Sequence, residues 1–381
     1  MDKKNPALGG VKQITENPDL AEVAFNDAGK DKQSQQETAR QDICCVVVLL
    51  HGLTMPSSET DKIKKGVEEK FGKVVEVIQP TCRKGVISAR LSIDKQAEMV
   101  VEEVESELCK KYLKYSKKAL KDLPWMIIGH SQGAEVAMNI GYYYSDQLNI
   151  AGIISIGGPL TGTDVLENTR SDVNEFYEKA EKGLEVIGVS DSRWSQKRAK
   201  AAATVLNNFL LKPGADCLLK GVSDMRTGSS CSQKIKEFIR DNKNHKSNAH
   251  HIPILLIAVY IRDWNKCFPL EEEQGKDVEE FFKVYTKFTT RQENGAHDLL
   301  ISVKRQLCRT NSFGNLAASK NDPVYPLNVS TYILEDKLHC TNLMSITSFV
   351  SVANGELSVN AEETIEVITD FITKNLYTLR P

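Results

Sequence analysis

The most informative segment of the chain is Trp125-Met126-Ile127-Ile128-Gly129-His130-Ser131-Gln132-Gly133-Ala134. Its apolar residues predict a buried strand that ends directly before Gly129, and the residues that follow predict a helix over Gly133–Tyr144. So sharp a turn from strand to helix leaves room only for very small residues two positions before and two positions after its central serine. Gly129 and Gly133 meet this requirement, so we expect Ser131 at the carboxyl end of a strand, beside a helix N-terminus.

Strand-like and helix-like segments alternate on both sides of this turn. The expected strands are Ile43–Leu50, Lys73–Ile78, Trp125–Ile128, Ile150–Ile156, His251–Tyr260 and Val329–Leu334, and the expected helices are Ser57–Phe71, Ser92–Leu120, Gly133–Tyr144 and Ala361–Leu376. Ile43–Leu50 is apolar throughout, which is typical of a strand covered on both faces of a parallel sheet. The alternation predicts an α/β chain with a doubly wound, mostly parallel sheet.

The remaining segments suggest how the chain is divided. Residues 1–40 are polar and show no sustained period, so we expect a flexible leader, followed by one α/β domain over 41–381. Residues of about 163–249 carry helical patterns without a clear strand and are too numerous for a connecting loop. We expect a helical lid or cap there, and a charged helical insertion at about 265–292.

Composition excludes several classes of protein. The 381 residues include 49 Lys and Arg against 51 Asp and Glu, a balance that argues against a generally basic nucleic-acid-binding protein. No apolar run approaches the roughly 18 residues that span a bilayer, and the first residues lack the apolar block of a secretory signal. The nine scattered cysteines form no C-x-x-C pair and no metal-ligand spacing. We therefore expect a cytoplasmic protein with reduced thiols, no metal and no nucleic-acid partner.

One charged cluster has two interpretations. It consists of Lys110, Lys111, Lys114, Lys117, Lys118 and Lys121. Cations at the end of a helix oppose its negative pole, and charge runs are usually solvated, so we favour a solvated helix end. The alternative is a patch attracted to anionic lipid, which would give the protein a peripheral contact with a lipid interface.

A serine hydroxyl is a poor nucleophile until a base removes its proton, so a partner histidine is required. Six of the seven histidines are excluded by position. His51 follows the first strand, and His130 lies in the turn itself, where we expect it to point away from the serine. The others come too early, at the strand 251–260, or adjoin a candidate acid: His245, His250 and His251 for the first reason, and His297 for the second. His339 follows the last strand. Elimination and chain order therefore both indicate His339 as the base for Ser131.

Two aspartates are candidates for the acid that would orient the His339 ring. Asp263 lies just after the strand at 251–260, and Asp298 lies further along the chain. Asp336 is too close to His339 in sequence to orient the ring from a separate loop. The residues alone do not separate Asp263 from Asp298.

Two backbone N–H groups are candidates for stabilising a developing oxyanion. They are the N–H of Gln132, directly after the serine, and the N–H of Leu53, directly after His51-Gly52 at the end of the first strand. One such donor typically lowers a reaction barrier by about 3 kcal/mol.

Several segments resemble the α/β-hydrolase superfamily, and within it the lipases and the lipase-like GPI-inositol deacylase group. The resemblance runs from about Cys44 to the C-terminus. It rests on four segments: Gly129–Gly133, which is the elbow, Ser155–Thr163, Ser223–Ser229 and Asp298–Ile301. The second of these is similar to the lipase T-P-x-x-G-S/T loop, with Gly158 in place of threonine. The last segment resembles the D-G-L-V loop that carries the family's catalytic acid, with Leu299 in place of its glycine. The resemblance therefore favours Asp298 over Asp263 and implies an α/β-hydrolase fold.

It also implies a function. We expect a serine ester hydrolase that cleaves a carboxylic ester, foremost of an acyl lipid, through an acyl-serine intermediate and without a cofactor. A thioesterase or acyltransferase would use the same residues on a different second substrate. A catalytically dead hydrolase fold that serves as a binding module is the alternative outside the enzymes.

Overall fold

The computed structural model describes residues 43–112, 122–169, 171–176, 219–241, 251–267, 275–292, 295–309, 328–339 and 356–377. The leader expected over 1–40 lies outside these ranges, as do most of the expected cap at 163–249 and the last part of the helix expected at 92–120. The fold described below is that of the remaining residues.

Six parallel strands form the centre of the domain. They are β1 (Cys45–Leu50), β2 (Val75–Ile78), β3 (Trp125–His130), β4 (Ile150–Ile156), β5 (Ile254–Tyr260) and β6 (Val329–Glu335), in the order β2-β1-β3-β4-β5-β6. The chain therefore steps outward from β1 to β2, returns to the other side of β1, and then proceeds in one direction to β6. The register pairs Leu50 with Gly129, so the segments after β1 and β3 leave the sheet side by side. The predicted doubly wound parallel sheet is confirmed.

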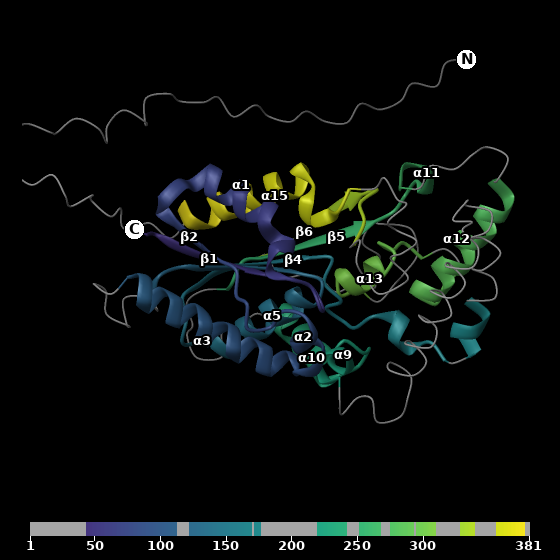
Figure 1. The fold of residues 1–381 in the computed structure, drawn as a ribbon, viewed down its shortest axis with the longest axis horizontal. Helices are drawn as coiled ribbons and strands as arrows, with labels where there is room; N and C mark the ends of the chain where they lie inside the picture. The colour runs from purple at the N-terminus through teal and green to yellow at the C-terminus, as the bar shows by residue number, and fades with distance from the viewer. Residues whose placement is uncertain are drawn as a thin grey trace, which may run out of the picture. The chain divides into compact units, whose positions relative to one another are not determined.

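Helices cover both faces of the sheet (Figure 1). On one face lie α1 (Asp61–Phe71) and α15 (Glu362–Tyr377), and on the other lie α3 (Ile93–Lys111), α5 (Gln132–Tyr144) and α10 (Ser230–Asp241). Side chains of β1 alternate between the two layers: Val46 and Val48 pack with α3 and α5, whereas Val47 and Leu49 pack with α1 and α15. Because both faces are covered, β1 is apolar throughout.

Shorter elements complete the described residues. They are η2 (Ser57–Thr60), η3 (Gly72–Val74), α2 (Val86–Arg90), η4 (Asp164–Glu167), a helical segment at 171–176, α9 (Lys220–Asp224), α11 (Trp264–Cys267), α12 (Gly275–Thr290), α13 (Val303–Gln306) and η7 (Ser358–Asn360). The charged insertion expected at about 265–292 corresponds to α11 and α12. The sequence did not indicate α2 or α13, because four or five residues are too few to establish a helical period.

Helix α3 begins as predicted, since the Ser92 hydroxyl accepts a hydrogen bond from the backbone N–H of Lys95 at 3.2 Å. In the basic cluster, Lys111 pairs with Glu76 at 2.5 Å, and the members beyond residue 112 lie outside the described ranges. The cysteine side chains at 44, 45, 82, 109, 231 and 308 are free thiols. None of the helices in the described ranges combines the length and the apolar character needed to cross a membrane.

The central strand predicts a stability difference. Ile127 in β3 is fully buried on the face of the sheet that α3 and α5 cover, whereas Val86 in α2 is 63% exposed. We expect Ile127→Ala to lower the free energy of unfolding by about 3 kcal/mol, because it removes buried methyl groups and leaves a cavity. The control Val86→Ala should change it by less than about 0.5 kcal/mol. Urea unfolding followed by tryptophan fluorescence measures both, and equal effects would contradict the assigned core.

Candidate active site

Ser131 lies on a strained turn between β3 and α5. Its φ of +53° and ψ of −126° are rare for a residue with a side chain. A Cβ atom on Gly129 would lie 2.2 Å from the Gly133 carbonyl oxygen, and one on Gly133 would lie 2.4 Å from the Leu50 carbonyl oxygen. These close backbone approaches leave room only for glycine at both positions. A hydrogen bond of 2.9 Å from the Ser131 N–H to the Ile156 carbonyl ties the turn to β4.

Three side chains from distant parts of the chain form a continuous hydrogen-bonded row. Ser131 Oγ lies 2.8 Å from His339 Nε2, and His339 Nδ1 lies 2.6 Å from Asp298 Oδ2. All three residues are buried. A carboxylate can only accept, so the ring proton is assigned to Nδ1, and the lone pair of Nε2 then faces the serine hydroxyl. This arrangement suits His339 to accept a proton from Ser131.

The Asp298 carboxylate is held by further donors. Its Oδ1 accepts from the backbone N–H groups of Leu300 at 3.0 Å and Ile301 at 2.7 Å, and its Oδ2 accepts from Gln306 Nε2 of α13 at 3.1 Å. The backbone N–H of His339 also donates to the Asp298 carbonyl at 3.3 Å. Hydrogen bonds to a carboxylate are strong, so these contacts fix Asp298 in position.

The other candidate acid lies in a different network. The backbone N–H groups of Asp263 and Arg262 donate to Asp336 Oδ1 at 2.7 and 2.9 Å, and Lys266 Nζ lies 2.6 Å from Asp336 Oδ2. Asp336 thus closes the loop that follows β5. Both ring nitrogens of His339 are engaged elsewhere, so the structure brings Asp298 rather than Asp263 to the imidazole.

His130 does not point away from the site, so that expectation was wrong. Its ring centroid lies 4.9 Å from that of His339, and its Nδ1 lies 3.2 Å from Glu59 Oε2. The same Glu59 oxygen accepts the backbone N–H of Gly52 at 2.6 Å. Although burial opposes the charged form of Glu59, its electrostatic interaction with His130 and its hydrogen bonds lower the pKa of Glu59 to about 2. Glu59 is therefore anionic at neutral pH and lies against the His130 ring.

The sequence did not single out Glu59, which lies seven residues after Gly52 in the link between β1 and α1. A carboxylate in such a link commonly caps the next helix or faces solvent. Only the folded chain reveals that it reaches both the backbone after β1 and the residue before Ser131.

Both candidate oxyanion donors lie at the ends of neighbouring strands. Gln132 is the first residue of α5, so its N–H is among those that lack an acceptor within the helix. Leu53 follows His51-Gly52 after β1, and a Cβ on Gly52 would lie 3.2 Å from Ser131 Cβ. The loop that carries Leu53 therefore passes directly beside the serine.

A buried arginine ties these two segments together. The Arg83 guanidinium donates to the backbone carbonyl of His51, to Gln132 Oε1 at 3.2 Å and to Gln96 Oε1 at 2.9 Å. Burial lowers the pKa of Arg83 to about 10, so it still carries its charge at neutral pH. No sequence pattern indicated this role, because the partners of Arg83 come from segments far apart in the chain.

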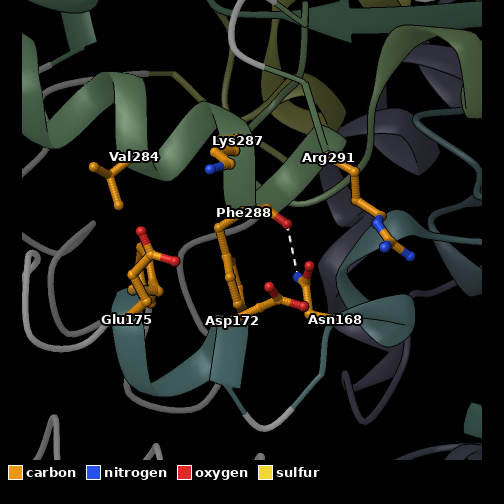
Figure 2. A pocket seen from close by; sticks show the side chains of 8 residues that line it. Asn168, Asp172, Glu175, Val284, Lys287, Phe288 and Arg291 are labelled. Atoms are coloured by element: carbon orange, nitrogen blue, oxygen red, sulfur yellow. Dashed lines mark hydrogen bonds between the residues drawn. The ribbon is translucent and has the colours of Figure 1, made fainter.

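A pocket of about 190 Å³ lies between the segment at 168–176 and helix α12 (Figure 2). Its walls carry opposite charges: Asp172 and Glu175 on the first segment, and on the other side Lys287 of α12 and Arg291, which directly follows this helix. The other lining residues are Asn168, Phe176, Val284 and Phe288. None of the predicted site residues lines this pocket. Within the described ranges, no group of three or more histidine, cysteine, aspartate or glutamate residues is arranged to hold a metal ion.

Comparison with known proteins gave structural matches only. No family model matches the sequence, and neither does any curated protein. The phospholipase PlaB from Legionella pneumophila superposes with a TM-score of 0.46 and 12% identity over 88% of this chain and 63% of its own. A carboxyl esterase from Bacillus coagulans gives 0.36 and 14%, covering 88% of this chain and 91% of its own. An esterase from Thermogutta terrifontis gives 0.35 and 12%, with 88% and 92% covered.

This chain thus spans less than two thirds of PlaB. The fold itself follows from the parallel sheet, its strand order and the strained serine turn between β3 and α5. The chain has the α/β-hydrolase fold that its sequence predicted.

The buried histidine behind this turn predicts a pH dependence of stability. Burial, reinforced by Arg83, lowers the pKa of His51 from 6.5 to about 4. The unfolded chain binds a proton near pH 6.5 and the folded chain only near pH 4, so stability falls as the pH drops through this window. His51→Asn keeps a donor for the Gly52 carbonyl but does not titrate in this window. Between pH 7 and pH 4 we therefore expect its free energy of unfolding to fall by up to about 3 kcal/mol less than that of the wild type.

Urea unfolding at pH 7, 6, 5 and 4 measures this difference. Parallel stability curves for the two proteins would contradict a neutral, buried His51.

Proposed function

We propose that this protein is a serine hydrolase that cleaves carboxylic esters through an acyl-serine intermediate on Ser131. The observation that carries the proposal is the row formed by Ser131 Oγ, the His339 ring and the Asp298 carboxylate, with contacts of 2.8 and 2.6 Å. Nucleophile, base and orienting acid in this relation are the arrangement that activates a serine hydroxyl. Acyl lipids are proposed as the substrate class on the lipase-like sequence motifs.

In the first half of the reaction, His339 Nε2 takes the proton from Ser131 Oγ while this oxygen attacks the ester carbonyl. The positive charge that forms on the ring lies against the Asp298 carboxylate, 2.6 Å from Nδ1. The backbone N–H groups of Gln132 and Leu53 stabilise the oxyanion, each by about 3 kcal/mol. The ring then gives its proton to the leaving alcohol, and the acyl group stays on Ser131.

In the second half, water takes the place of the alcohol. His339 accepts a proton from the water as it attacks the acyl carbonyl, and returns that proton to Ser131 Oγ as the carboxylic acid leaves. Every group in this route is a side chain or a backbone N–H of the chain, so the proposed reaction requires no cofactor.

Two alternatives to an ester hydrolase remain open to test. A thioesterase or an acyltransferase would share the attack by Ser131 and differ in the second substrate. Assays with a panel of acyl-CoAs, alcohols and lipid esters distinguish these activities. A catalytically dead binding module would need no activated serine. The 2.8 Å contact between Ser131 and His339 speaks against it.

The nucleophile assignment predicts the loss of one modification and of turnover together. Ser131→Ala should lower kcat/KM for p-nitrophenyl esters by a factor of about 10⁴ or more and abolish labelling by a fluorophosphonate probe. Ser155, a buried serine at the end of β4, provides the control, and Ser155→Ala should keep labelling and turnover. Full turnover by Ser131→Ala would refute the proposed function.

The acid assignment predicts a contrast between two isosteric substitutions. Asp298→Asn removes the charge that faces Nδ1 of His339 and disturbs the ring's tautomer, so kcat should fall by about 10⁴-fold. Asp263→Asn, the matched control, should change kcat by less than about threefold, because the ring nitrogens of His339 contact Asp298 and Ser131 and not Asp263. Steady-state hydrolysis of a p-nitrophenyl ester measures both. A large loss in Asp263→Asn alone would reverse the assignment.

A further inference from the structure

The residue directly after Asp298 has an unusual backbone. Leu299 has a φ of +83°, in the left-handed region that residues with side chains rarely adopt. It is also buried, so the turn does not lie on a mobile surface loop. A strained conformation persists only where surrounding contacts hold it, which raises the question of what holds Leu299.

Both peptide groups of Leu299 form hydrogen bonds with buried side chains. Its N–H donates to His297 Nδ1 at 3.1 Å, and its carbonyl accepts the Tyr285 hydroxyl at 2.8 Å. Since Nδ1 of His297 accepts, its Nε2 carries the proton and donates to Thr286 Oγ1 at 3.0 Å. Thr289 Oγ1 adds a longer contact of 3.5 Å to the Leu299 carbonyl.

Three of the side chains in this arrangement come from one face of α12. Tyr285, Thr286 and Thr289 are buried toward the loop that carries Asp298. Val284, Lys287 and Phe288 of the same helix line the pocket of Figure 2. The helix thus presents one set of side chains to the pocket and another to the Asp298 loop.

The turn at Leu299 determines where the next two N–H groups point. Leu300 and Ile301 donate to Asp298 Oδ1 because the chain reverses between them and the carboxylate. If Leu299 relaxed to a negative φ, the peptide plane after it would rotate and these donors would leave the carboxylate. Apart from His339, only Gln306 would then hold the Asp298 carboxylate, which would be less firmly fixed against His339 Nδ1.

We propose that His297 and Tyr285 are positioning residues, which hold the Leu299 peptide groups in the left-handed turn and so fix the Asp298 carboxylate against His339. The inference rests on the proposed role of Asp298. Neither residue touches the reacting atoms; each acts through the backbone of Leu299.

The first test compares substitutions that remove or keep each contact. Tyr285→Phe removes only the hydroxyl, and His297→Leu removes the acceptor for the Leu299 N–H. We expect kcat for a p-nitrophenyl ester to fall about tenfold or more in each, with KM within about twofold. His297→Asn should retain most of kcat, because an asparagine side chain can accept from the N–H two residues on. If His297→Leu fails to fold, Tyr285→Phe alone decides, and an unchanged kcat overturns the proposal.

The second test isolates the backbone of Leu299 with a matched pair. Leu299→Gly and Leu299→Ala both remove the buried side chain, but only glycine adopts a positive φ without cost. With Tyr285 intact, the two should differ in kcat by about threefold or less. In the Tyr285→Phe background, the glycine variant should exceed the alanine variant by about tenfold or more. An equal ratio in both backgrounds would show that Tyr285 contributes to stability only, and would overturn the proposal.

A readout that needs no turnover separates this inference from the proposed function. Proton NMR should show a far-downfield resonance for the short His339–Asp298 hydrogen bond, which Asp298→Asn removes and which therefore identifies it. Tyr285→Phe should shift or broaden it, and adding Leu299→Gly should restore it. A resonance unchanged by Tyr285→Phe overturns the inference even if Ser131→Ala is inactive. A resonance that responds as expected, in a protein whose Ser131→Ala variant remains active, refutes the proposed function and supports the positioning.

Discussion

The whole site depends on how closely α5 approaches β1. Gly133, in the first turn of α5, lies so near the Leu50 carbonyl that no Cβ atom fits between them. At this close approach of α5 to β1, Ser131 takes up its positive φ of +53° directly before the helix. A looser approach would let the serine turn relax, and the oxygen of Ser131 would no longer face His339.

Much of the architecture could be predicted because local patterns determine it. The serine turn, the six strands and the position of His339 after β6 follow from apolar runs, glycine spacing and chain order. Glu59 and Arg83 could not be predicted, because their roles arise from contacts between segments far apart in the chain. The inward position of His130 was missed for the same reason, since it depends on Glu59.

The Asp298 loop shows how a sequence departure can be compensated by the fold. Leucine follows Asp298 where the resembled lipase loop has glycine. The residues alone did not separate Asp298 from Asp263, and the resemblance favoured Asp298 despite this departure. The structure keeps the left-handed turn that a glycine would adopt easily, and hydrogen bonds from both sides of the peptide stabilise it. Because Tyr285 belongs to α12, no local pattern around Asp298 could have indicated its contact with Leu299. His297 adjoins Asp298 in sequence, but its role depends on the hydrogen bond between its ring and the Leu299 N–H, which only the folded chain reveals.

The planar fork of Arg83 also constrains how this chain can diverge in evolution. Its three nitrogens point in fixed directions toward three separate segments, so a lysine could satisfy at most part of that geometry. Insertions or deletions in the link between β1 and α1 would shift the His51 carbonyl away from the guanidinium and leave a buried cation under-solvated. Related chains that keep this arginine should therefore vary in length elsewhere, and those that lose it should rebuild the link as a unit.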